Sequence, residues 1–95
     1  IPIGRTMVTN GTSDDKFGVD VWEVQPGQVP FADLGYDELF YILEGSISMT
    51  GTDGNEQTYA AGEGVILPSG WSGTARIPDN GARMVLMWHL NKSGD

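Results

Sequence analysis

Glycine and proline interrupt this chain at short, regular intervals, and this spacing limits its fold more than any other feature. The 95 residues include 14 glycines and 5 prolines. Between the breaks lie apolar or alternating stretches of five to eight residues, a length typical of β-strands. No stretch keeps an apolar period of 3.6 residues over ten positions, so we expect little helix. The pattern predicts an all-β sandwich or closed barrel of seven or eight short strands.

The position of each strand follows from the same breaks. The segments that we predict as strands are residues 17–24, 39–43, 46–50, 56–60, 65–67, 72–77 and 83–90. Glu44 and Gly45 separate the second from the third, and residues 51–55 have the glycine and asparagine of a hairpin loop. We expect residues 65–67 to be buried. We also expect one domain over residues 1–95, with its core at about 17–90 and flexible polar ends.

The charge and composition exclude several classes of function. Thirteen acidic residues against five basic ones give a net charge of −8, which repels phosphate backbones and anionic lipid, so we predict no nucleic-acid or membrane partner. The chain has no cysteine, and therefore no disulfides, thiolate zinc sites or thiol nucleophiles. Its first five residues lack the apolar region of a signal peptide, so we expect a cytoplasmic protein. Because the chain begins with Ile1 rather than Met, a removed leader stays an open alternative.

Two segments in the middle of the chain resemble the paired motifs of cupins. Residues 37–45 read Asp-Glu-Leu-Phe-Tyr-Ile-Leu-Glu-Gly, and residues 62–70 read Gly-Glu-Gly-Val-Ile-Leu-Pro-Ser-Gly. The positions that match the motifs are Glu38, Gly45, Gly62, Pro68 and Gly70. The chain looks most like the small single-domain cupins related to ethanolamine-utilisation Q-type proteins. This resemblance implies an antiparallel jelly-roll barrel (a double-stranded β-helix, RmlC-like) that is often dimeric and has a pocket inside.

The sequence departs from the cupin pattern where cupins bind metal. The residues at the three histidine positions are Ala32, Leu34 and Gly73, or Phe31 and Asp33 for the first two after a shift of one residue. Of the four usual ligands only Glu38 remains. A transition metal needs three or four nitrogen, oxygen or sulfur donors that converge on it, and one carboxylate does not supply them. We therefore predict no metal and no cofactor.

Glu38 is the acidic residue of greatest interest. Its alternation with Phe40 and Ile42 directs the carboxyl to the barrel interior if that face is the inner one. Burial would raise the pKa of Glu38 unless an arginine or hydroxyl group pairs with it, and a raised pKa suits a catalytic acid or base. Tyr36, two residues earlier, could donate a hydrogen bond to this carboxyl or contact a ligand. The alternative is a purely structural carboxylate that a tyrosine hydroxyl satisfies.

Aromatic residues complete the predicted pocket, although most of them would belong to the core of a sandwich. Trp71 follows Pro68-Ser69-Gly70 at a strand end, where the pocket mouth should lie, and its ring can stack on a flat or sugar-like ligand. In the subgroup that this chain resembles, a basic residue often stands near Met84, so the resemblance implies a less polar pocket here. The residues that we predict to line the pocket are Trp22, Tyr36, Glu38, Phe40, Trp71 and Met84.

The single histidine, His89, lies in the last predicted strand. The continuously apolar face of this strand, which is the better core face, consists of Met84, Leu86, Trp88 and Leu90. Alternation therefore points His89 outward or toward a partner chain. The less favoured alternative is a site made by Glu38, His89 and an aspartate such as Asp33.

Three functions from different classes remain open. The first, which we favour, is a module that binds a small molecule in the barrel without a metal. The second is a small isomerase, lyase or hydrolase that uses Glu38 as acid or base and Tyr36 to polarise or protonate its substrate. The third is a structural or assembly subunit of a metabolic complex. The thin core of so short a chain, together with the resemblance, also predicts a homodimer.

Overall fold

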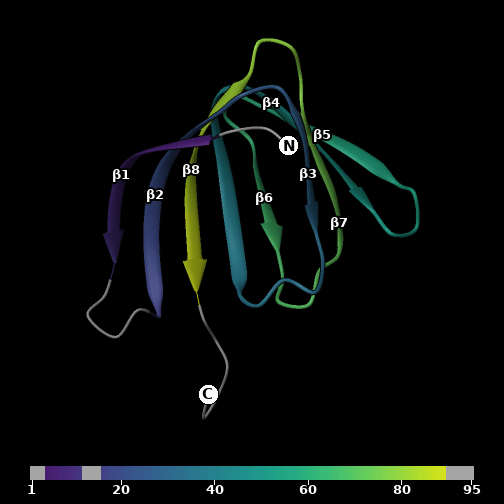
Figure 1. Cartoon of the computed structure of the whole chain (residues 1–95), viewed down its shortest axis with the longest axis horizontal. Coiled ribbons are helices and arrows are strands. Elements are labelled where there is room, and N and C mark those ends of the chain that lie inside the picture. Colours follow the sequence, from purple (N-terminus) through teal and green to yellow (C-terminus); the bar gives the residue numbers. More distant parts are fainter. Residues whose placement is uncertain (1–3, 12–15, 90–95) are drawn as a thin grey trace.

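The computed structural model describes residues 4–11 and 16–89, and the side chains of residues 16–89. These residues form eight strands and no helix (Figure 1), so the prediction of an all-β fold is confirmed. The strands are β1 (Gly4–Gly11), β2 (Phe17–Val24), β3 (Gly27–Phe31), β4 (Asp37–Gly51), β5 (Glu56–Ala60), β6 (Gly64–Leu67), β7 (Gly73–Ile77) and β8 (Ala82–His89).

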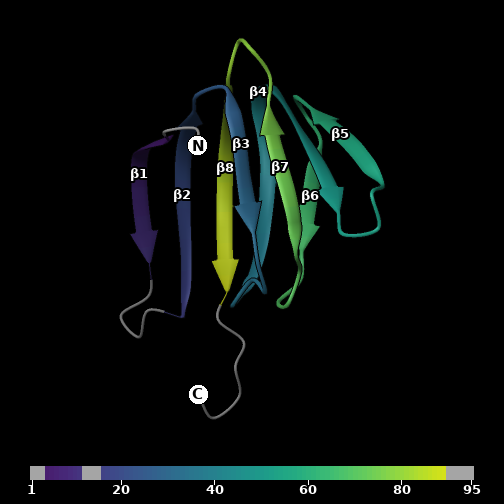
Figure 2. The same cartoon turned by 45° about the vertical axis from the view of Figure 1, so that its right-hand side comes forward.

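The strands form one curled antiparallel sheet in the order β1-β2-β8-β4-β7-β3. Strand β4 belongs to both halves, because its first part pairs with β8 and β6 and its second part pairs with β7 and β5. Figure 1 shows β1, β2, β8, β4 and β6 side by side, and Figure 2 shows β3 and β7 in front of β4. We call β1-β2-β8-β4-β6 the first half-sheet and β3-β7-β4-β5 the second.

A bend in β4 turns the chain from one half-sheet into the other. The pairing with β8 shifts between Ile42 and Glu44. Gly45 then has a φ of 79°, in the left-handed region that disfavours residues with a Cβ atom. A Cβ atom there would also overlap the carbonyl oxygen of Gly81. The predicted break at Glu44 and Gly45 is therefore a corner of the barrel, inside one continuous strand.

The core fills the space between the two half-sheets and comes from alternate residues of the central strands. Phe40, Ile42 and Met84 are its largest fully buried side chains. Glu38, on the same face of β4, is the only charged side chain buried among residues 16–89, with 5% of its surface exposed. The face that Glu38 shares with Phe40 and Ile42 is therefore the inner one, which the alternation in the sequence had left as a condition.

The structure corrects the strand predictions at the edges of the barrel. Residues 4–11, which we expected to be a flexible end, form β1, and residues 27–31, which we did not predict as a strand, form β3. Only part of β6 is buried, because Ile66 is 71% exposed. Strand β8 ends at His89, and Leu90 lies outside the described residues. None of the described residues forms a helix long and apolar enough to cross a membrane.

Candidate functional site

A cavity of about 310 Å³ opens between the first half-sheet and β3. Strands β2, β3, β4 and β8 supply its walls, together with the loop that precedes β4. The residues that line it are Asp20, Trp22, Val29, Phe31, Tyr36, Glu38, Phe40 and Leu86. The site therefore combines two carboxyl groups with four aromatic side chains.

The register of the first half-sheet brings the two carboxyl groups onto one wall. Asp20 of β2 pairs with Leu86 of β8, and Leu86 pairs in turn with Phe40 of β4. Glu38 lies two residues before Phe40 and therefore points to the same side of the sheet. Asp20 and Glu38 thus flank the same strip of β8 from opposite sides.

The loop before β4, which places Tyr36 at the cavity, is held by hydrogen bonds to a second loop. Asp33 has a φ of 51°, and its amide donates to the Ser72 hydroxyl at 2.9 Å. Leu34 forms two backbone hydrogen bonds across to the loop after β6, from its amide to the carbonyl of Trp71 at 3.0 Å and from the Gly70 amide to its own carbonyl at 2.6 Å. These hydrogen bonds connect the segment before β4 to the loop after β6 and thereby restrain the backbone next to Tyr36.

The indole of Trp88 packs against the ring of Tyr36. The two rings meet edge to face, with centroids 6.4 Å apart and an angle of 65° between their planes. The indole of Trp88 lies directly over Gly18, its partner on β2, where a Cβ atom would overlap the ring. Gly18 therefore makes room for Trp88, and Trp88 packs against Tyr36 beside the cavity.

The Glu38 carboxyl is the most perturbed acid of the described chain. Burial raises the pKa of Glu38 from its ordinary value of 4.5 to about 7; hydrogen bonding with Tyr36 lowers this pKa, and the charge of Asp20 raises it further. Burial, the charge of Glu38 and the hydrogen bond with Glu38 together raise the pKa of Tyr36. The Oε1 atom of Glu38 is buried and has no hydrogen-bond partner. A carboxyl held in this way can bind a donor group or exchange a proton near neutral pH.

The structure brings together four of the six predicted pocket residues: Trp22, Tyr36, Glu38 and Phe40. Met84 is fully buried in the core and does not line the cavity. Trp71 packs against Phe31, with ring centroids 5.9 Å apart and an angle of 63°, and is likewise absent from the lining.

Sequence reasoning missed four lining residues: Asp20, Val29, Phe31 and Leu86. Asp20 had a usable sequence signal, because it lies two residues before Trp22 and therefore on the same face of β2. Leu86 also had one, since we assigned it to the inner face of the last strand. Val29 and Phe31 had none, because their strand was not predicted.

The donors at this site do not fit the metal that cupins commonly bind. At the position of the second-motif histidine, a Cβ atom on Gly73 would overlap the indole of Trp71, so the ring occupies the space of a ligand side chain. His89 and Asp33 are both exposed. Over residues 16–89, no three His, Cys, Asp or Glu side chains gather in one place. The alternative site of Glu38, His89 and Asp33 is therefore not formed.

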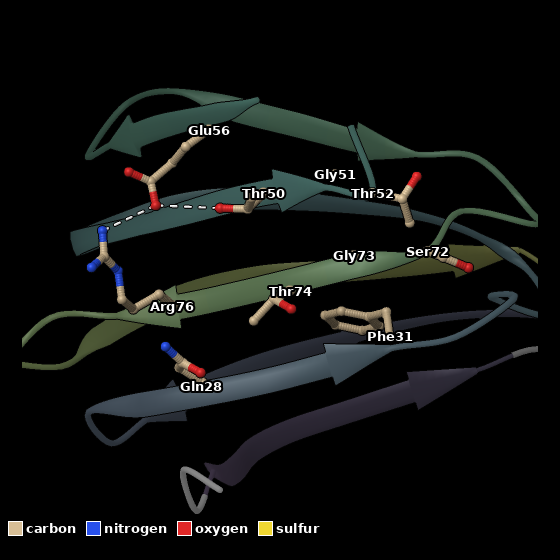
Figure 3. A pocket seen from close by; sticks show the side chains of 10 residues that line it. All are labelled: Gln28, Phe31, Thr50, Gly51, Thr52, Glu56, Ser72, Gly73, Thr74 and Arg76. Atoms are coloured by element: carbon tan, nitrogen blue, oxygen red, sulfur yellow. Dashed lines mark hydrogen bonds and ion pairs between the residues drawn. The ribbon is translucent and has the colours of Figure 1, made fainter. Parts of the chain in front are cut away.

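A larger hollow, of about 510 Å³, lies on the outer face of the second half-sheet (Figure 3). Its charged groups already satisfy each other: Arg76 pairs with Glu56 at 3.0 Å, and the same carboxylate oxygen accepts from the Thr50 hydroxyl at 3.3 Å. These side chains are about half exposed, so water competes for them. The smaller cavity is lined by Glu38, whose carboxyl group has an unpartnered oxygen, and is therefore the better candidate site.

Comparisons with solved structures support the fold. EutQ from Clostridium difficile matches with a TM-score of 0.78 at 22% identity, over 94% of this chain and 64% of that chain, so this chain spans less than two thirds of that protein. Ethanolamine utilization protein Q from Salmonella typhimurium LT2 matches with a TM-score of 0.75 at 20% identity, over 96% and 71% of the two chains. Ectoine synthase from P. lautus matches with a TM-score of 0.77 at 16% identity, over 92% and 64%.

Likenesses at these identities show the fold alone, and they confirm the predicted jelly-roll barrel. No match was found among curated protein sequences. The family profile of the EutQ-like cupin domain matches residues 11–83, which is most of the chain and includes both predicted motifs. This chain therefore belongs to the EutQ-like cupin family.

Proposed function

We propose that this protein binds a small metabolite in the cavity between the first half-sheet and β3, without a metal ion. The observation that carries the proposal is the carboxyl group of Glu38: its Oε1 atom is buried and has no hydrogen-bond partner, and Glu38 is one of the residues that line an aromatic cavity. An unsatisfied buried polar group costs roughly 1–3 kcal/mol. A bound ligand that donates to Oε1 recovers this free energy.

The shape and composition of the cavity also suit a small ligand. Small-molecule sites are typically apolar and aromatic clefts of about 300–1,000 Å³ with a few placed polar groups. The cavity here lies at the lower end of that range. Its polar groups are the carboxyls of Asp20 and Glu38 and the hydroxyl of Tyr36, which stand among apolar walls.

The three tryptophans of the chain provide a direct test of this proposal. Trp22 lines the cavity, whereas Trp88 packs against Tyr36, Trp71 packs against Phe31, and neither of these two lines it. In an NMR screen against metabolite mixtures, a ligand of the cavity is expected to shift the indole N–H signal of Trp22 and leave that of Trp71 nearly unchanged. A screen in which no metabolite shifts the Trp22 signal, or in which only Trp71 responds, contradicts the proposal.

Paired variants of two glutamates on β4 make the test specific. Glu38→Gln removes the acid from the cavity, and Glu44→Gln removes one from the exposed surface of the same strand, where it contacts Arg83 at 3.4 Å. We expect Glu38→Gln to weaken the binding of a screened ligand at least tenfold and Glu44→Gln to change it less than twofold. Equal effects of the two variants would place the ligand elsewhere.

A second candidate function is acid–base catalysis by Glu38. The observation in its favour is the pKa of this carboxyl, which burial raises to about 7 and which suits a group that gives and takes a proton at neutral pH. Tyr36 then serves to polarise or protonate the substrate. For a screened ligand that is also converted, this function requires a rate that follows the titration of Glu38 and collapses in Glu38→Gln. Unchanged turnover in the variant excludes it.

An assembly subunit without a ligand is the least supported reading. A purely structural barrel would be expected to fill its interior with its own side chains. The cavity beside Glu38 stays open instead, and the Oε1 atom of this lining residue has no hydrogen-bond partner.

A further inference from the structure

We propose that the ligand of the cavity is a small organic ammonium ion, a protonated primary or secondary amine on an apolar skeleton. This inference rests on the proposed function, because it names the chemical class that the cavity between the first half-sheet and β3 accepts. It is carried by the pairing of two carboxyl groups with aromatic walls and by the absence of any cationic side chain among the lining residues that the structure describes.

The charges around the cavity favour a cation. Asp20 and Glu38 both line it, and the charge of one acts on the other. The two arginines whose side chains the structure describes are engaged elsewhere: Arg83 pairs with Glu23 at 2.9 Å, and Arg76 pairs with Glu56 on the outer face of the second half-sheet. An anionic ligand would therefore meet two carboxyl groups without a balancing charge, whereas an ammonium ion gains from both.

The aromatic side chains strengthen this preference. The faces of aromatic rings attract cations, by about 0.5–1 kcal/mol at exposed positions and about 2 kcal/mol or more where water is excluded. Trp22, Phe31, Tyr36 and Phe40 surround the same space as the carboxyl groups. The skeleton of an amine can therefore contact the rings while its nitrogen faces the acids.

The unpartnered oxygen of Glu38 favours ammonium ions that carry N–H groups. Oε1 of Glu38 accepts hydrogen bonds and has none. A primary or secondary ammonium ion carries N–H groups that can donate to it, whereas a quaternary ammonium ion has no such donor. Hydrogen bonds to charged groups contribute about 1.5–3 kcal/mol, so this contact separates the two kinds of cation.

The proton of Glu38 links this recognition to pH. The titratable groups that face Glu38 are Asp20 from β2 and Tyr36 from the loop before β4. The side chains that β8, β6 and β3 place on the same interior do not titrate: Leu86, Trp88, Leu67, Val29 and Phe31. An ammonium ion binds the ionised carboxyl and displaces its proton, so the affinity is expected to rise by about tenfold between pH 6 and pH 8.

An isosteric series of probes tests the assignment: cyclohexylmethylammonium, cyclohexylmethanol and cyclohexanecarboxylate. Their dissociation constants come from the Trp22 indole signal at pH 6 and pH 8, where an alkylammonium stays protonated. We expect the ammonium ion to bind at least tenfold more tightly than the alcohol at pH 8, and the carboxylate not to bind. Tetramethylammonium is expected to bind more weakly than the primary ammonium ion.

Variants of both acids separate charge recognition from a general loss of structure. Glu38→Gln is expected to weaken ammonium binding at least tenfold, to abolish its pH dependence and to leave alcohol binding within twofold. Asp20→Asn, at a half-buried position, gives an independent test and is expected to reduce the preference for the ammonium ion over the alcohol.

The failure of this inference is distinguishable from that of the proposed function. If the alcohol or the carboxylate shifts the Trp22 signal as strongly as the ammonium ion, the cavity binds small molecules but the ammonium assignment is overturned. An ammonium preference that survives in both acid variants overturns it as well. If neither the probes nor the metabolite screen shifts that signal, the proposed function itself fails.

Discussion

At the scale of single residues, the carboxyl of Glu38 makes the stability of the fold depend on pH. Its pKa is 4.5 in an exposed chain and about 7 in the folded protein, so the folded state binds this proton more tightly than the unfolded state does. The contribution of Glu38 to the free energy of unfolding therefore falls as pH rises from 4.5 to 7 and stays low above that. At roughly 1.4 kcal/mol for each pH unit, the loss is about 3 kcal/mol.

Urea unfolding of the native protein and of Glu38→Gln at pH 5 and pH 8 measures this effect. Glutamine stays neutral, so the variant is expected to gain about 2–3 kcal/mol relative to the native protein between the two pH values. Glu44→Gln serves as the control and should follow the native protein within about 1 kcal/mol, because its carboxylate is exposed. A difference between Glu38→Gln and the native protein that does not change with pH would contradict the burial of an ionisable Glu38.

The sequence predicts a candidate-site residue well where strand alternation determines the direction of its side chain. The period of two residues puts Glu38 and Phe40 on one face of their strand, and the structure shows that this face is the inner one. Trp71 lies in a loop, where no such period applies, and its ring turned toward Phe31. The missing partner of Oε1 could not be predicted either, because it depends on which groups of distant strands meet that atom.

At the scale of single elements, the bend in β4 depends on a residue without a side chain. Replacing Gly45 by alanine introduces a Cβ atom at a φ of 79° and against the carbonyl oxygen of Gly81. We expect Gly45→Ala to lower the free energy of unfolding by about 3 kcal/mol, from strain and overlap together. Thermal or urea unfolding measures the loss.

Gly54→Ala separates the two causes. Gly54 has a similar φ of 85°, but a Cβ atom there meets no other atom within 4 Å. This control is expected to cost only about 1 kcal/mol, from strain alone. Equal losses in the two variants would show that the contact with Gly81 does not matter and that β4 can bend without it.

The strands that the sequence failed to predict are the two at the ends of the strand order, β1 and β3. Strand β3 contains Pro30 and follows Pro26, so its residues look like a turn, yet an edge strand tolerates proline because one side of it needs no partner. Strand β3 forms its backbone hydrogen bonds with β7, which lies more than 40 residues later in the chain. Central strands carry a strong apolar pattern because neighbours cover them, whereas edge strands are defined by a partner that local sequence does not reveal.

At the scale of the whole molecule, we expect the outer face of the first half-sheet to form the interface of the predicted homodimer. All the large hydrophobic side chains that the described residues leave exposed lie on β2, β4 and β6: Phe17, Tyr41, Leu43 and Ile66. The register aligns Ile66 with Leu39 and Met87 across this face. On a chain with a net charge of −8, these side chains offer two copies an apolar surface to share.

Sedimentation equilibrium at micromolar concentrations measures this association. We expect the native protein to be dimeric and Ile66→Glu, which adds a charge at the most exposed residue of that face, to weaken the dimer at least tenfold. Gln28→Glu adds the same charge on the outer face of the second half-sheet and should leave the dimer unchanged. A native protein that stays monomeric, or a dimer that tolerates Ile66→Glu, would exclude this arrangement.

The central claim is that the barrel holds a carboxyl poised to receive a ligand, and the titration of that carboxyl tests it most directly. Side-chain ¹³C NMR follows every glutamate and aspartate as pH is varied. We predict one glutamate signal that titrates near pH 7, is absent from Glu38→Gln and moves to lower pH when cyclohexylmethylammonium is added. If every carboxyl titrates below pH 5.5 in the free protein, Glu38 is neither buried nor unpaired as described, and the account is contradicted.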